Sequence, residues 1–142
     1  MRRAGIALMA LAAIAVGCGT SSTPTSSSDT AAATTTTALL AGTLDIQGQR
    51  FYSFTVSTAG DVRLTLASVT QGDGVSPIDT PIGIGLGVPA GLGCSMSSSV
   101  TVQPGLTAQV IEALPVGVHC ANVFDIGTLK APATFALRLV YP

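Results

Sequence analysis

The chain has 142 residues, of which 47% are hydrophobic, 9% charged and 4% aromatic, and its formal net charge is −1. This length suits one domain, and so few basic residues exclude a protein that neutralises a row of nucleic-acid phosphates. A charge-rich disordered chain is also excluded, because too few residues repel one another. The composition therefore predicts one folded domain with no nucleic-acid partner.

The first 18 residues have the pattern of an export signal. Two arginines precede an apolar run from Ile6 to Val16, which is shorter than the roughly 20 residues that a spanning helix needs. The run ends at Ala15-Val16-Gly17-Cys18, which resembles a bacterial lipobox. The resemblance implies a signal peptide over residues 1–17 and attachment of fatty acid, such as palmitate, to the Cys18 thiol. An ordinary secretory signal with an incidental cysteine is the alternative.

Lipidation at Cys18 predicts a membrane-anchored protein of the cell envelope. One acyl chain holds a protein only marginally, whereas two or three chains on one cysteine hold it almost permanently. Gly19 follows the cysteine, at the place where Asp retains lipoproteins at the inner membrane in enteric-type sorting. We therefore expect the outer membrane rather than the inner one in a Gram-negative cell.

A tether follows the lipidated cysteine, and together they are expected to occupy residues 18–38. Thirteen of the nineteen residues from 20 to 38 are Ser or Thr, and none is aromatic. Such a segment buries too little to offset its chain entropy, so we expect a flexible linker with a span of roughly 25 Å. Once residues 1–17 are removed, four basic and seven acidic residues remain, a net charge of −3. A polybasic membrane surface is thus not predicted.

Residues 39–142 are expected to fold into one all-β domain. Apolar residues alternate with small or polar ones, as half-buried strands require, at 52–56, 62–66, 82–88, 100–102 and 135–139. Turn signals rich in Gly, Pro and Asp separate these segments. Residues 106–114 could be read as a helix, but the Pro and Gly on both sides favour a strand. The pattern predicts a single antiparallel β-sandwich or jelly-roll of about seven or eight strands.

Two cysteines remain in this domain, Cys94 and Cys120. In an exported protein an even pair predicts a disulfide, which would close a loop of about 26 residues and contribute roughly 3.5 kcal/mol. A reactive thiol or metal ligand is the alternative, because Cys120 lies beside His119, the only histidine. Neighbouring residues on a strand point to opposite faces, however, so these two are not expected to form a catalytic pair.

Two parts of the domain resemble a known family. The segment from Gly117 to Gly127, followed by Ala133 to Tyr141, is similar to the last two strands of bacterial pre-peptidase C-terminal (PPC-like) domains. The segments Gln49–Val56 and Ala59–Leu66 are similar to the opening hairpin of the same domains. The resemblance implies a compact β-sandwich or jelly-roll without chemistry of its own. Such domains are usually appended to secreted peptidases and are thought to aid secretion, localisation or substrate binding.

No residue set predicts catalysis, a metal site or a cofactor. The segment Gly85–Ala90 matches G-x-G-x-x-A, but no helix is expected after it to receive a pyrophosphate. Asp73, Asp79 and Asp125 lie in or near loops and leave calcium open, although solvated turn residues are the favoured explanation. The chain is therefore expected not to be an enzyme.

Two features predict a ligand or partner surface. Phe51 is expected to point outward or to pack in the core, while Tyr52, Phe54 and Phe135 are expected in the core. Gly83, Gly85 and Gly87 leave one face of a strand without side chains, which favours pairing with a partner or a close contact within the fold. The sequence predicts a non-catalytic lipoprotein that binds or positions an exported protein or an envelope polysaccharide or other polymer. A calcium- or carbohydrate-binding module on the cell surface is the alternative.

Overall fold

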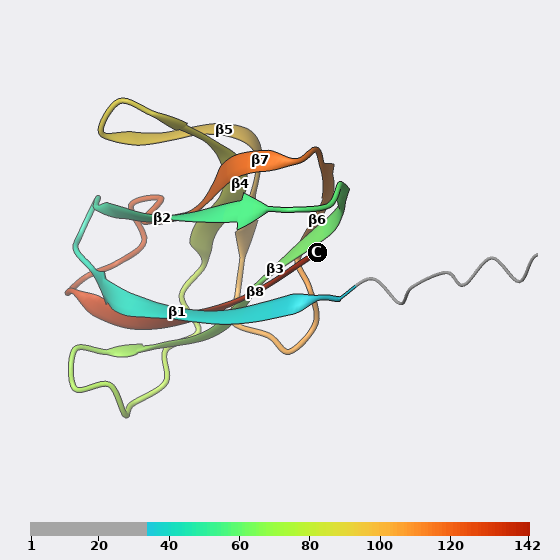
Figure 1. Cartoon of the computed structure of the whole chain (residues 1–142). Helices are drawn as coiled ribbons and strands as arrows, with labels where there is room; N and C mark the ends of the chain where they lie inside the picture. The colour runs from blue at the N-terminus through green and yellow to red at the C-terminus, as the bar shows by residue number, and fades with distance from the viewer. Residues whose placement is uncertain (1–33) are drawn as a thin grey trace, which may run out of the picture. The chain divides into compact units, whose positions relative to one another are not determined.

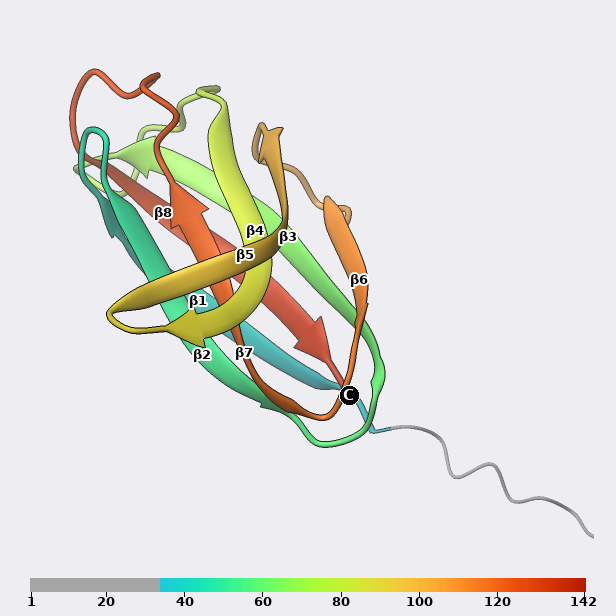
Figure 2. The ribbon, with the colours of Figure 1, turned by 90° about the horizontal axis from the view of Figure 1, so that it is seen from above.

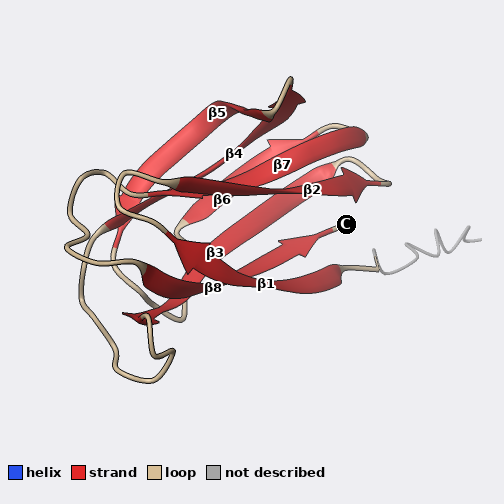
Figure 3. Cartoon of the chain, turned by 90° about the vertical axis from the view of Figure 1, so that its left-hand side faces the viewer, coloured by secondary structure: helices blue, strands red, loops and turns tan. Residues whose placement is uncertain are grey.

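The structure, a computed structural model, describes residues 34–142. The predicted signal peptide, Cys18 and most of the predicted linker lie outside these residues. The described part of the chain contains eight strands and no helix (Figure 3). The strands are β1 (Thr36–Leu44), β2 (Gln49–Val56), β3 (Gly60–Gln71), β4 (Ile82–Ala90), β5 (Gly93–Val102), β6 (Val110–Leu114), β7 (Gly117–Phe124) and β8 (Ala133–Tyr141).

The strands form two four-stranded antiparallel sheets that pack face to face. The first sheet has the strand order β1-β8-β3-β6, and the second has the order β2-β7-β4-β5 (Figure 1). The prediction of an all-β sandwich with seven or eight strands is confirmed. Residues 110–114 form β6, so the strand interpretation of residues 106–114 is confirmed for its second half.

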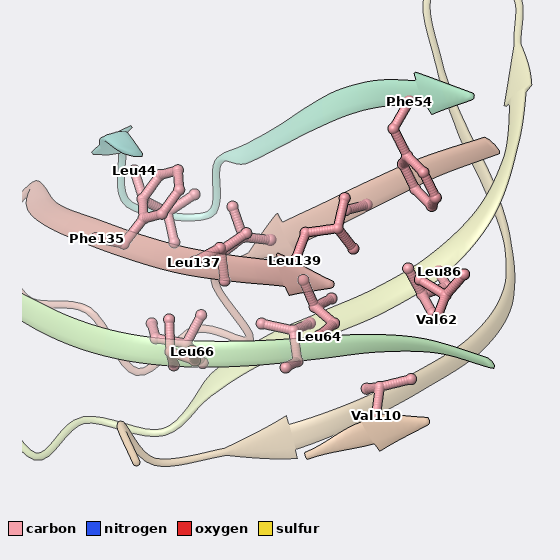
Figure 4. Close-up of a cluster of buried hydrophobic side chains, with 14 of the residues drawn as sticks. Leu44, Phe54, Val62, Leu64, Leu66, Leu86, Val110, Phe135, Leu137 and Leu139 are labelled. Carbon is pink, nitrogen blue, oxygen red and sulfur yellow. The ribbon is translucent and has the colours of Figure 1, made fainter. Parts of the chain in front are cut away.

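The core lies between the sheets and follows the predicted alternation. Leu64 is opposite Leu139 and Leu66 is opposite Leu137 across the β3–β8 ladder, and all four are buried (Figure 4). A bulge between Leu66 and Ser68 shifts the alternation by one residue, which turns Val69 into the core beside Phe135. Strict alternation of inward and outward side chains along β3 would have placed Val69 on the outer face.

The sandwich begins earlier than the expected boundary at residue 39. β1 starts at Thr36, and Thr36 to Ala38 pair with Tyr141 to Leu139 of β8. Threonine is favoured in strands because its branched side chain suits a pleated surface. The Ser/Thr composition that predicted a linker therefore continues into the first strand.

The two ends of the sandwich differ. Because Thr36 pairs with Tyr141, the described chain begins and ends at one end, which we call the terminal end (Figures 1 and 2). The opposite end, the loop end, gathers the β1–β2 turn, the β3–β4 loop and the β7–β8 loop. A backbone hydrogen bond joins the first of these segments to the last, since the Asp125 amide donates to the Gly48 carbonyl at 2.9 Å.

Candidate functional site

The glycine stripe of β4 is covered by the chain itself. Gly83, Gly85 and Gly87 are buried, and a Cβ on any of them would overlap a neighbour. The neighbour is the Phe124 ring at Gly83, the Ser98 carbonyl at Gly85 and the Ser95 carbonyl at Gly87. The close contact within the fold, one of the two interpretations of the stripe, is what the structure shows. The three glycines do not form an open partner surface.

The cover is the β4–β5 hairpin, which bends across the outer face of the second sheet (Figures 1 and 2). β5 is the edge strand, and β4 lies between it and β7 in the sheet order. Strands two places apart in a flat sheet lie roughly 10 Å apart. Cys94 of β5 and Cys120 of β7 nevertheless have their Cα atoms 6.0 Å apart and form a disulfide. β5 therefore lies over β4, which only glycines allow.

The predicted disulfide is thus confirmed, and it separates Cys120 from His119. His119 points into the sandwich, where its ring is buried, packs 6.0 Å from the Phe54 ring and donates from Nε2 to the Pro115 carbonyl at 2.8 Å. Cys120 points to the outer face and is bonded to Cys94. The two side chains lie on opposite faces of β7, so they do not form a nucleophile and base.

The aromatic residues of β2 divide between the two faces as alternation predicts. Phe54 is buried, and Tyr52 packs at the core edge with its ring 6.3 Å from that of Phe135. The Tyr52 hydroxyl donates to the Ala41 carbonyl at 2.9 Å and so covers part of the open edge of β1. Phe51 is on the outer face and is 37% exposed, which agrees with its outward interpretation.

A cavity of about 330 Å³ lies at the loop end, between the β3–β4 and β7–β8 loops. Its lining combines apolar surface with hydroxyl, amide and ammonium groups. The lining residues are Gln71, Gly72, Ile78, Thr80, Thr128, Leu129, Lys130, Ala131 and Pro132. Lys130 is the one charged residue among them, so the cavity suits a polar, electroneutral or anionic group rather than a cation.

An aspartate organises each of the two loops that form the cavity. Asp125 Oδ1 accepts hydrogen bonds from the amides of Gly127, Thr128 and Leu129 at 3.0, 2.9 and 3.1 Å, and Oδ2 accepts one from Gln47 at 2.8 Å. Desolvation raises the pKa of Asp125, but these four donors together outweigh it, so its pKa lies below the usual value for Asp. Thr128 also donates from its hydroxyl to the Pro81 carbonyl at 2.6 Å, which joins the two loops.

Asp73 has the same role in the β3–β4 loop. Its Oδ1 accepts from the amides of Val75 and Ser76 at 2.9 and 3.0 Å, and its Oδ2 accepts from the Ser76 hydroxyl at 2.9 Å. The pKa of Asp73 is lowered chiefly by the Val75 amide and then by the two Ser76 donors. Both carboxylates therefore stabilise backbone turns, so both walls of the cavity are held in place before a ligand arrives.

Residues 34–142 contain no group of three or more His, Cys, Asp or Glu side chains that could hold a metal ion. Asp73 and Asp125 direct their oxygens to N–H and O–H donors, whereas calcium would need those oxygens itself. Asp79 lies on the surface of the β3–β4 loop. Within the same residues, no helix has the length and hydropathy needed to cross a bilayer.

Sequence reasoning missed the cavity and one link between the sheets. Turn residues predicted both loops, but nothing in the sequence indicated that they meet. The Glu112 carboxylate of β6 accepts hydrogen bonds from the hydroxyls of Ser97 and Ser98 in β5 at 2.9 and 2.5 Å. This contact joins the first sheet to the hairpin across the edge of the sandwich. A lone Glu among Ser residues gives no signal of such a contact.

No family model matches the chain, and no curated protein is significantly similar to it. The resemblance to pre-peptidase C-terminal domains therefore stays a prediction.

Proposed function

We propose that the protein is a lipid-anchored, non-catalytic lipoprotein of the cell envelope whose sandwich binds or positions an exported protein or an envelope polymer. The anchor is Cys18, which the lipobox resemblance indicates. The observation that carries the binding role is the geometry of the sandwich. The chain that leads from Cys18 enters at the terminal end, while the cavity lies at the loop end.

An anchored module is useful to a partner only if its binding surface stays accessible. Entry of the tether at one end leaves the opposite loop end free to face away from the attachment point. Loops on a rigid scaffold are the usual place for recognition, because the scaffold tolerates their variation. The loop-end cavity meets this description, since Asp73 and Asp125 hold its two walls.

The export proposal has support from the disulfide. Such bonds persist in oxidising compartments outside the cytosol. The Cys94–Cys120 bond closes over a sheet face and is only partly exposed, which suits a structural rather than a reactive role. In a Gram-negative cell the absence of Asp after Cys18 favours the outer membrane.

Retention of envelope components on the purified, acylated protein tests the binding role. Lys130→Glu reverses the charge at the cavity, and Arg63→Glu makes the same change on the exposed outer face of the first sheet. We expect a retained protein or polymer that Lys130→Glu releases and Arg63→Glu leaves bound. Equal retention by all three forms, or no retained component at all, would contradict the proposal.

The alternative function, a calcium- or carbohydrate-binding module on the cell surface, can be tested directly. A melting-temperature measurement with millimolar calcium, together with a glycan array, would support it by a thermal shift or an array signal.

A further inference from the structure

The outer face of the second sheet and the hairpin that crosses it expose apolar side chains. We call the surface formed by Phe51, Val88, Leu92, Met96 and Val118 the uncharged face. Leu92 at the hairpin tip is fully exposed, and the other four are between about a third and three-fifths exposed. Residues 80–111, which include the whole hairpin, contain no charged residue. Exposed apolar side chains in one region of a surface favour contact with a membrane or another molecule.

The outer face of the first sheet also exposes apolar side chains, Leu39 and Ile111, but it carries charged residues beside them. Asp61, Arg63 and Arg138 lie on the side of β3 and β8 opposite the core and are exposed. The outward positions of β2 and β7 carry Gln, Phe, Ser, Thr, Val, Cys and Asn but no ionised side chain among the described residues. The outward positions of β2 and β7 are thus uncharged, whereas those of β3 and β8 include Asp61, Arg63 and Arg138.

The hairpin that presents Leu92 is held in place at both of its sides. The Cys94–Cys120 disulfide fixes it to β7, and the Glu112 carboxylate fixes Ser97 and Ser98 to β6. Contact through Leu92 therefore requires little further ordering of the chain. A tip that protrudes also suits insertion into a soft surface better than docking on a flat protein face.

We propose that the uncharged face rests on the lipid bilayer that holds the anchor, with Leu92 at the boundary of headgroups and acyl chains. This inference rests on the proposed lipid anchor. Fifteen residues separate Cys18 from Thr34, and covalent geometry limits the reach of fifteen residues to about 50 Å. Such a link holds the sandwich at about millimolar effective concentration near the bilayer, so a weak contact suffices.

Charge favours the same orientation. The chain from Cys18 onward has a net charge of −3, and a bilayer with anionic lipids repels carboxylates. The five side chains of the uncharged face bring no carboxylate of their own to such a bilayer, and the Glu112 carboxylate, which reaches the hairpin, is bound by the Ser97 and Ser98 hydroxyls. The apolar residues of the uncharged face then lie in the interfacial region, as in proteins that bind membranes peripherally.

A single-tryptophan experiment tests the proposal, because the chain contains no Trp. The probe is the acylated full-length protein in vesicles of phosphatidylcholine with anionic phosphatidylglycerol, with and without brominated acyl chains. Leu92→Trp reports on the hairpin tip. Leu106→Trp is the matched control, since Leu106 is 87% exposed and its carbonyl accepts from Arg138 on the first sheet.

We expect brominated lipid to quench Leu92→Trp at least about threefold more than Leu106→Trp, with a blue-shifted emission for Leu92→Trp alone. Equal quenching, or solvent-like emission from both, would overturn the proposal while leaving the anchor intact if both variants sediment with vesicles. If neither sediments, the proposed function fails and the inference fails with it. If Leu92→Trp has solvent-like emission on vesicles but is shielded from solvent when an envelope protein is added, the face docks a protein instead.

Discussion

The two sheets of the sandwich have different outer faces. The first sheet exposes threonines and arginines, together with Leu39 and Ile111, to solvent, so only its inner face is packed, as in most antiparallel sheets. The second sheet is packed on both sides at β4 and in the middle of β7, because the β4–β5 hairpin covers its outer face there. The sequence difference is small: alternate positions are polar in β3 and glycine in β4. Glycine at alternate positions thus indicates that another backbone lies against the strand.

Loss of the disulfide should have the largest effect on stability, because it frees the hairpin that covers the outer face of the second sheet. The Cys94→Ala, Cys120→Ala double variant loses the bond between the hairpin and β7, and we expect a loss of about 3.5 kcal/mol and a Tm lower by about 10 °C or more. Thermal unfolding with and without reductant measures this. The wild type should fall to the level of the variant when reduced, and a reductant-insensitive wild type would contradict the role of the bond.

Filling the glycine stripe should have the next largest effect. Gly87→Val places side-chain atoms where the Ser95 backbone lies, so we expect a loss of about 3 kcal/mol in denaturant unfolding. Ala113→Val makes a similar change at an exposed outer position of β6 and should stay within about 0.5 kcal/mol.

Gly83→Ala and Gly87→Ala compare the cost of a methyl group at two positions of the glycine stripe. The atoms nearest to Gly83 belong to the Phe124 ring, which can rotate, whereas Gly87 faces backbone. Gly83→Ala should therefore cost less than Gly87→Ala. The reverse order would show that the hairpin does not lie on β4 as described.

The contact between Glu112 and the hairpin should matter less. Glu112→Gln keeps the shape and removes the charge from the hydrogen bonds to Ser97 and Ser98, and we expect a loss of about 1 kcal/mol. A double-mutant cycle with Ser98→Ala isolates the pair by denaturant unfolding. Strict additivity of the two changes would exclude a coupling across the sandwich edge.

Acid should act on the loop end rather than on either sheet face. The folded-state pKa of Asp125 is lowered, so its contribution to stability is complete above the unfolded pKa of about 3.9 and is lost as pH falls through the folded pKa. Asp125→Asn should therefore flatten the dependence of Tm on pH between about pH 5 and 3. If Tm changed with pH equally in the wild type and in Asp125→Asn, this contribution of Asp125 would be contradicted.

The sequence predicted the strands that have one polar and one apolar face. β2, the start of β3, β4 and β8 all show that alternation, and the pairing of Cys94 with Cys120 followed from their number. The first half of β5 was missed, because its serines resemble a loop and it is a strand only where β4, the disulfide and Glu112 hold it. β1 was missed because its Thr and Ala residues continue the composition of the predicted linker.

The site was less predictable than the fold. The glycine stripe left two interpretations open, because a sequence does not say which segment approaches a bare strand face. The cavity depends on two loops that are about fifty residues apart in the chain and meet only through the sandwich topology. Lys130 carried no signal of its own, since a single exposed lysine is common on any surface.

The proposed function requires that a lipid on Cys18 holds the sandwich at a membrane. Intact-mass analysis of the protein extracted from membranes of the producing cells tests it most directly. We predict a polypeptide that begins at Cys18, carries the added mass of acyl chains and lacks two hydrogens for the Cys94–Cys120 bond. A polypeptide that retains residues 1–17, or one with an unmodified Cys18 recovered from the culture fluid, would contradict the proposed lipid anchor.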